Sequence, residues 1–175
     1  MKRSFQSLSP QEALHVAVFI EERNAQIYHR FAEMFSSFQD FSSLEIAGVL
    51  WEMAVEERQH STLLQRRYEA RFGQAACALT DTDIMEIIEL PLLDGSGVFD
   101  PQAEAATAQR RALEIALRAE TSARSYYSEL AQSTSEPDLQ ALYTELAAFE
   151  EEHVRFLEGR LTGEISSQRG DTEDE

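Results

Sequence analysis

Four long stretches of this chain carry apolar residues at spacings of three and four, the pattern of amphipathic helices that bury one face. They run from residue 9 to about 38, from 42 to 73, from 100 to about 132 and from 135 to about 160. The whole chain has only seven glycines and four prolines in 175 residues, which argues against a turn-rich β-sandwich or barrel. Each stretch is roughly twice the average helix length of about 11–12 residues or longer, so we predict a bundle of four long helices.

Each stretch begins with a helix-start signal, and two of these signals are capping boxes, in which a serine is followed three residues later by a glutamate. Proline at the first helical position strengthens three of the four starts. The predicted starts are Ser9–Glu12, Ser42–Glu45, Asp100–Pro101 and Ser135–Asp138. Glycines predict the ends of the second and fourth helices, at Gly73 and at Gly159 or Gly163.

The connections between the predicted helices differ in length. About five residues join the first helix to the second and the third to the fourth, which predicts two antiparallel hairpins. Residues 74–99 join the hairpins and are predicted to contain a short helix, Thr80–Leu90, and a turn at Asp94–Gly97. One long crossover between two hairpins is the ferritin-like topology. We therefore predict an all-α, ferritin-like four-helix bundle, residues 1–161, followed by an acidic disordered tail, residues 162–175.

Composition argues against several classes of function. The chain has 32 acidic and 15 basic residues and a formal net charge of -17, which disfavours nucleic acids and anionic membrane surfaces as partners. A single cysteine, Cys77, cannot form a disulfide within the chain or a four-cysteine metal site. The apolar run 46–51 is too short to span a bilayer, and the N-terminal residues lack a secretory pattern. We expect a cytoplasmic protein.

Four glutamates interrupt the apolar stripes of the predicted helices: Glu21, Glu57, Glu120 and Glu150. The residues three and four positions away from each of them are mainly apolar or small. Burying one unpaired carboxylate is costly, and four buried together repel one another. Either these side chains are protonated or a cation lies among them.

Two of these glutamates precede a histidine by three residues, which puts carboxylate and imidazole on one helix face, where both can bind the same metal. The pairs are Glu57 with His60 and Glu150 with His153. The other two glutamates precede a tyrosine by seven residues, or two turns, so that the phenol can donate a hydrogen bond to a metal ligand. These pairs are Glu21 with Tyr28 and Glu120 with Tyr127.

A single Glu-x-x-His match is weak, because glutamate is common in helices and Glu12 and His15 match it as well. The duplication is more specific, because each predicted hairpin has the order Glu, Tyr, loop, Glu-x-x-His. Within each hairpin the two glutamates also lie at depths that agree within about two residues, or ~3 Å. We therefore predict one shared metal site rather than a set of solvated positions. The pattern leaves open whether the two tyrosines support ligands or only fill the core.

Glutamates from two helices and Glu-x-x-His from two others resemble the ligand arrangement of ferritin-like di-iron carboxylate proteins. At the residue level the chain resembles the rubrerythrin branch of that superfamily over about residues 9–160. The matching stretches are 20–28, 54–60, 119–127 and 146–153. The resemblance implies two iron ions, with Glu57 and Glu150 as bridging carboxylates, Glu21 and Glu120 as terminal carboxylates, and His60 and His153 as imidazole ligands. A manganese–iron pair fits the same ligands.

The resemblance further implies a di-iron oxidoreductase that oxidises Fe(II) with hydrogen peroxide or oxygen, as a peroxidase or ferroxidase in iron and oxidative-stress handling. We expect Tyr28 and Tyr127 to be residues of the catalytic centre. We also expect an electron donor, which the sequence does not identify, and a homodimer or higher homo-oligomer. An iron-storage or iron-delivery module is the alternative function, and a metal-free helical adaptor is a third interpretation.

Two features depart from the rubrerythrin pattern. Rubrerythrins commonly carry a rubredoxin domain with a four-cysteine iron site, which a chain with one cysteine cannot form. They also often have a further glutamate one turn along the third helix, where this chain has Ala123. The second departure predicts a more symmetric, bacterioferritin-type ligand set without a strong preference for peroxide.

Overall fold

The computed structural model describes residues 5–38, 40–88 and 105–163 of the chain. These residues form a short 3-10 helix, η1 (Phe5–Ser7), and five α-helices. The α-helices are α1 (Pro10–Phe38), α2 (Phe41–Phe72), α3 (Asp81–Ile87), α4 (Ala105–Ser133) and α5 (Pro137–Thr162). No strand occurs in the described part of the chain, so the all-α fold class is confirmed.

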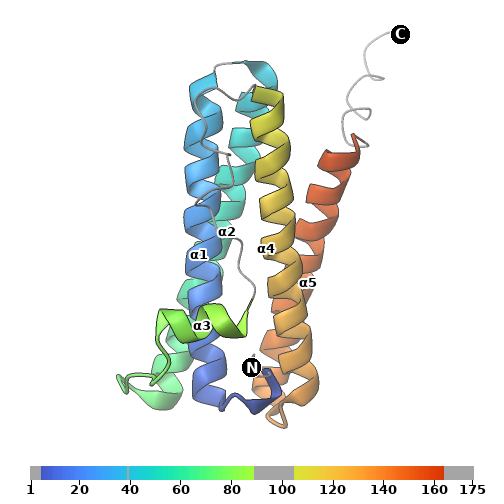
Figure 1. Cartoon of the computed structure of the whole chain (residues 1–175). Coiled ribbons are helices and arrows are strands. Elements are labelled where there is room, and N and C mark those ends of the chain that lie inside the picture. The colour runs from blue at the N-terminus through green and yellow to red at the C-terminus, as the bar shows by residue number, and fades with distance from the viewer. Residues whose placement is uncertain (1–4, 39, 89–104, 164–175) are drawn as a thin grey trace, which may run out of the picture.

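The four long helices lie side by side in one bundle, and α3 crosses its lower end (Figure 1). α1 packs along α2, α4 packs along α5, and the two hairpins meet mainly through α1 and α4. α2 ends at the lower end of the bundle, whereas α4 begins at the upper end, so these two helices run in the same direction. The connection between the hairpins therefore starts and finishes at opposite ends of the bundle, as expected for the predicted crossover.

Most of the predicted helix boundaries are confirmed. The Ser9 hydroxyl accepts the Glu12 backbone N–H, and the Glu12 carboxylate accepts the Ser9 backbone N–H at 2.8 Å, which completes the first capping box. Gly73 ends α2, and Gly163 ends α5 in the left-handed conformation, with φ of 77°, that favours glycine.

The predicted capping box at residues 42–45 is wrong. α2 begins at Phe41, and its N-cap is Asp40, whose Oδ1 accepts the Ser43 backbone N–H at 2.9 Å. Ser43 is buried, and its hydroxyl accepts a hydrogen bond from Gln109 of α4 at 2.8 Å. Glu45 accepts a hydrogen bond from Arg160 of α5 instead of reaching back to the helix start. Glu45, which the local pattern assigned to the cap, therefore makes a contact with the second hairpin.

The remaining sequence predictions have mixed outcomes. The short helix of the crossover is confirmed but ends at Ile87, and Thr80 and Asp83 form its capping box. Three predicted features lie outside the described residues: the helix start at Asp100–Pro101, the turn at Asp94–Gly97 and the tail beyond Gly163. α5 continues through Thr162, one residue past the predicted end of the domain. None of the described helices is long and apolar enough to cross a membrane.

Two hydrophobic clusters fill the bundle, one toward each end. The lower cluster contains the buried tyrosines 126, 127 and 143 together with Ile84 and Ile87 of α3. The upper cluster contains Phe31 and Phe35 of α1 with apolar residues of α2, α4 and α5. Each long helix carries one buried glutamate, which lies between its residues of the lower cluster and its residues of the upper cluster. The bundle is therefore apolar at both ends and polar at mid-height.

The cap at Asp40 gives the first prediction. Replacing Asp40 with alanine should lower the melting temperature of the protein, because the first turn of α2 loses its side-chain acceptor. Asp40→Asn, which keeps an acceptor oxygen, should lose less. Ser42→Ala is the matched control and should have little effect. Thermal unfolding followed by circular dichroism compares the variants, and a larger loss for Ser42→Ala would place the helix start where the sequence alone predicted it.

Candidate metal centre

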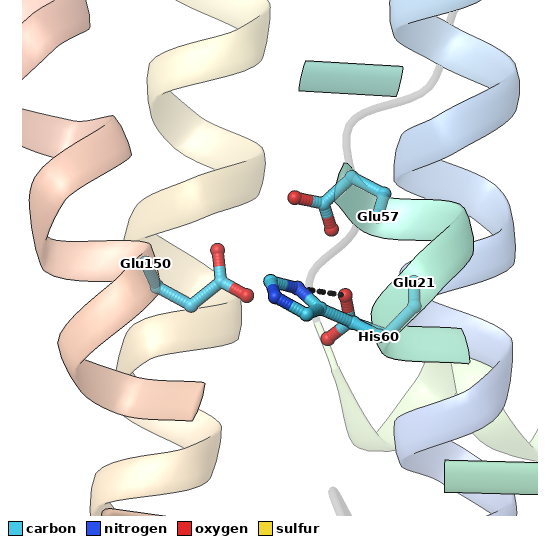
Figure 2. Close-up of side chains that lie close together, drawn as sticks. All are labelled: Glu21, Glu57, His60 and Glu150. Atoms are coloured by element: carbon cyan, nitrogen blue, oxygen red, sulfur yellow. Dashed lines mark ion pairs between the residues drawn. The ribbon is translucent and has the colours of Figure 1, made fainter. Parts of the chain in front are cut away.

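Four glutamates meet at mid-height of the bundle, one from each long helix. Glu21 comes from α1, Glu57 from α2, Glu120 from α4 and Glu150 from α5, and all four side chains are fully buried. Figure 2 shows Glu21, Glu57 and Glu150 converging on the space between the helices, together with His60 of α2. The structure therefore brings together side chains that lie up to 129 positions apart in the sequence.

The converging residues form two overlapping groups, each of which could hold a metal ion. One group consists of Glu21, Glu57, His60 and Glu150, and the other of Glu57, Glu120, Glu150 and His153. In each group, one nitrogen or oxygen from every residue lies within 4.8 Å of the others. Glu57 and Glu150 belong to both groups, so the arrangement offers two adjacent candidate metal positions with two shared carboxylates.

The unpartnered atoms of the site fit a pair of metal ions. Both carboxylate oxygens of Glu57 and Glu150 are buried without a hydrogen-bond partner among the described residues. The same is true of one oxygen each of Glu21 and Glu120 and of Nδ1 of His60 and His153. Buried polar atoms are normally paired, so a set left unpaired at one place indicates a missing partner. Two free oxygens on each shared glutamate and one on each unshared glutamate are the donors that two metal ions require.

The second oxygen of each unshared glutamate accepts a hydrogen bond from a tyrosine of the other hairpin. The Tyr28 hydroxyl on α1 donates to Glu120 on α4, and the Tyr127 hydroxyl on α4 donates to Glu21 on α1. Burial, followed by the neighbouring carboxylates, raises the pKa of both tyrosines well above the usual value, so they remain neutral donors. The sequence placed both phenols on the glutamate face, but the hydrogen bonds cross between hairpins.

The two histidines lie at the edge of the site, and about an eighth of each side chain is exposed. His153 directs Nδ1 toward the carboxylates, at 3.3 Å from Glu57, 3.5 Å from Glu120 and 3.8 Å from Glu150. His60 Nδ1 lies 3.4 Å from Oε2 of Glu21 (Figure 2). In both rings Nδ1 is therefore the atom that faces the candidate metal positions.

Comparison with known proteins agrees with this geometry. Residues 111–172, which include Glu120, Glu150 and His153, match the rubrerythrin family. The matched residues cover most of the second hairpin, so the similarity to rubrerythrins by this comparison spans less than half of the chain. The first hairpin lies outside the matched residues, but it repeats the same order of glutamate, tyrosine and Glu-x-x-His.

A solved structure supports the all-α bundle fold over most of the chain. An uncharacterized conserved protein from Magnetospirillum magnetotacticum is 24% identical, with a TM-score of 0.69. The similarity covers 89% of this chain and 95% of the other, and at that identity it establishes the fold alone. No curated protein gives a significant sequence match.

Sequence reasoning missed three residues around this candidate metal site. Glu56 precedes Glu57 directly and so lies on a different face of α2, but its Oε2 lies 2.9 Å from Nε2 of His153. Phe149 packs on the His60 ring, with the ring centroids 5.1 Å apart. Asn24 is fully buried one turn after Glu21, and neither polar atom of its amide has a partner among the described residues. An asparagine on the apolar stripe of α1 was the available signal for the last of these.

Other acidic neighbours of the candidate ligands lie outside the centre. Glu22 is exposed, and Glu151 forms ion pairs with Arg124 and Arg155 away from the centre. Ala123 is fully buried in the lower hydrophobic cluster, so the third long helix presents a methyl group where rubrerythrins often have a glutamate. The roles of the six metal-ligand residues and of Tyr28 and Tyr127 stay predictions, because the comparisons do not test individual residues.

Most of the resolved pKa shifts in the cluster favour the uptake of protons when no metal is bound. Burial, followed by repulsion from neighbouring carboxylates, raises the pKa of Glu57 and Glu150 well above the usual range. Burial alone would lower the pKa of His153, but the carboxylates of Glu120, Glu150 and Glu57 raise it far above the usual value. Contacts with Glu150, His153 and Tyr28 outweigh burial and lower the pKa of Glu120. These shifts favour a protonated His153 imidazole and neutral carboxyl groups on Glu57 and Glu150 in the metal-free protein.

These pKa directions predict an unusual pH dependence. Groups whose pKa is raised by folding bind more protons in the folded state, so their stabilisation is lost as the pH rises through the folded-state pKa. The metal-free protein should therefore become more stable as the pH falls from 8 toward about 5, above the usual glutamate pKa of about 4.3. Chemical unfolding of the chelator-treated protein at several pH values measures this trend.

The variant Glu57→Gln/Glu150→Gln distinguishes the contribution of the buried cluster to this pH dependence from the contribution of the negatively charged surface. It cannot take up the protons in question, so its stability should change less over the same pH range. Equal slopes for the variant and the unmodified protein would show that the buried carboxylates do not carry the effect.

Proposed function

We propose that this protein holds two iron ions at the centre and oxidises Fe(II) with hydrogen peroxide or oxygen. The observation that carries the proposal is the set of unpartnered buried donor atoms on the four glutamates and two histidines. Mixed carboxylate and imidazole ligands suit iron, and a manganese–iron pair is compatible with the same donors. Glu57 and Glu150 would each bind both ions, Glu21 and His60 would bind one, and Glu120 and His153 the other.

The iron pair would supply two electrons, one from each Fe(II), which together with two protons convert hydrogen peroxide to two water molecules. The chain would contribute position and environment. Tyr28 and Tyr127 hold one oxygen of each unshared glutamate by a hydrogen bond, which leaves the other oxygen directed at the centre. The hydrophobic clusters above and below keep bulk water from the carboxylates, all of which are fully buried.

The alternative function is an iron-storage or iron-delivery module that uses the same ligands. Size-exclusion chromatography with mass determination separates the two functions. The proposed oxidoreductase predicts a dimer or another small oligomer, whereas a storage shell predicts a particle of many subunits.

Metal content tests the proposal most directly. Protein loaded with Fe(II) and then desalted should retain roughly two iron ions per chain, the stoichiometry of a di-iron centre. Glu57→Ala or Glu150→Ala should lose most of both ions, because each residue is placed to bind both. Elemental analysis of the folded variants measures the ratio, with Glu22→Ala as a control whose exposed carboxylate lies on another face. Full occupancy in either bridging variant would contradict the assignment.

Stability gives an independent readout of metal binding. The metal-loaded protein should melt well above the metal-free protein at neutral pH, because metal binds the folded ligand set. The difference should shrink as the pH falls through the range in which free histidine and then glutamate protonate, ~6.5 to ~4.3, because protons compete for the ligands. A melting temperature that responds to neither iron nor chelator would favour a metal-free bundle.

The oxidant preference follows from Ala123. If the further glutamate of rubrerythrins is what favours peroxide, this protein should oxidise bound Fe(II) with hydrogen peroxide and with oxygen at comparable rates. Stopped-flow absorbance after mixing the reduced protein with each oxidant gives both rates. Peroxide faster by several hundredfold would refute the argument from Ala123, and Ala123→Glu, which restores the carboxylate, should shift the ratio toward peroxide.

A further inference from the structure

The two hairpins supply equivalent glutamates, tyrosines and histidines to the centre, but the residues that pack against the two histidines differ. Glu21 corresponds to Glu120, Tyr28 to Tyr127, Glu57 to Glu150 and His60 to His153, in the order in which they occur in each hairpin. Four residues before His60 the chain has Glu56, and four residues before His153 it has Phe149. Each of these two residues contacts the histidine of the opposite hairpin, so the two imidazoles have chemically different neighbours.

His153 is held by a carboxylate on its outer side. Nε2 of the ring lies 2.9 Å from Oε2 of Glu56, which reaches it from α2. A hydrogen bond from Nε2–H to this carboxylate fixes the tautomer in which Nδ1 carries the lone pair. Nδ1 is the atom that faces Glu57, Glu120 and Glu150. Such an outer carboxylate both orients a ligating imidazole and increases its basicity.

His60 has an apolar neighbour in the equivalent place. The Phe149 ring lies 5.1 Å from the imidazole ring, with an angle of 41° between the ring planes. Among the described residues the only ion pair of His60 is formed by Nδ1 with Glu21 on the inner side. A phenyl ring limits the space available to the imidazole but cannot accept a proton from it. The His60 ring is therefore packed, whereas the His153 ring is hydrogen-bonded.

We propose that the two metal positions are unequal and that Glu56 is a positioning residue that makes the position at His153 the tighter one. This inference rests on the metal centre of the proposed function, and it concerns affinity rather than the reaction. Loss of an outer hydrogen-bond partner of a ligating histidine typically weakens metal binding by roughly 10- to 100-fold. A difference in affinity of this size means that metal fills the position at His153 before the position at His60.

Cobalt(II) titration of the metal-free protein by isothermal calorimetry tests the proposal, with the visible absorption of the bound cobalt as a second readout. The unmodified protein should show two binding steps of different affinity. His153→Ala should abolish the tighter step and His60→Ala the weaker one. Glu56→Ala should weaken the tighter step by about tenfold or more and leave the other unchanged, and Glu56→Gln, which keeps a hydrogen-bond acceptor, should lie between.

Two further variants isolate the cause. Glu52→Ala removes the same charge from an exposed position one turn away on α2, so it should leave both steps unchanged. Phe149→Glu offers His60 the partner that His153 already has, and it should tighten the weaker step. Circular dichroism of each metal-free variant confirms that the bundle is intact before titration.

The outcomes distinguish this inference from the proposed function. Failure of the unmodified protein to bind cobalt would overturn both. Two steps of equal affinity, or a Glu56→Ala variant that weakens both steps equally, would overturn the inference and leave the di-metal centre intact. The same conclusion follows if Glu52→Ala has the effect of Glu56→Ala, or if Phe149→Glu leaves the weaker step unchanged.

Discussion

The mutual repulsion of four buried carboxylates is the constraint on which the rest of this bundle depends. Glu21, Glu57, Glu120 and Glu150 have no access to solvent, and charged groups in that position must be neutralised by protons or by cations. Long helices make the arrangement tolerable because each one carries apolar side chains both above and below its glutamate. The hydrophobic clusters thus stabilise a fold whose middle layer, without a counter-charge, would push the helices apart.

The tyrosine hydrogen bonds add a second consequence of that layer. Tyr28 and Tyr127 each connect the two hairpins, so the polar layer contributes to their association where α1 and α4 pack together. Neutral phenols suit this role, because they donate a hydrogen bond without adding charge to an already crowded site. The same contact therefore organises the site and orients one half of the protein on the other.

The layout of the fold and of the centre could be predicted because both follow from periodicity. Helix length, hairpin loops and the depth of each glutamate are local quantities, and together they place Glu57 beside Glu21 and Glu150 beside Glu120. Contacts between hairpins could not be read in this way. Asp40 rather than Ser42 caps α2, and Glu45 accepts a hydrogen bond from Arg160 of α5. Glu56 was overlooked because its partner, His153, belongs to the other hairpin. Periodicity shows the face on which a side chain lies, but not which helix lies opposite.

The repeated order of the hairpins also has a consequence for how such a centre can change over time. One hairpin carries half of the donor set, so two identical copies of it could in principle assemble a complete centre, but every substitution would then appear twice. Joining the halves in one chain removes that restriction. A glutamate can stand next to one histidine and a phenylalanine next to the other, as Glu56 and Phe149 do here. The long crossover, which contributes no ligand among the described residues, is thus the feature that frees the two sides to diverge.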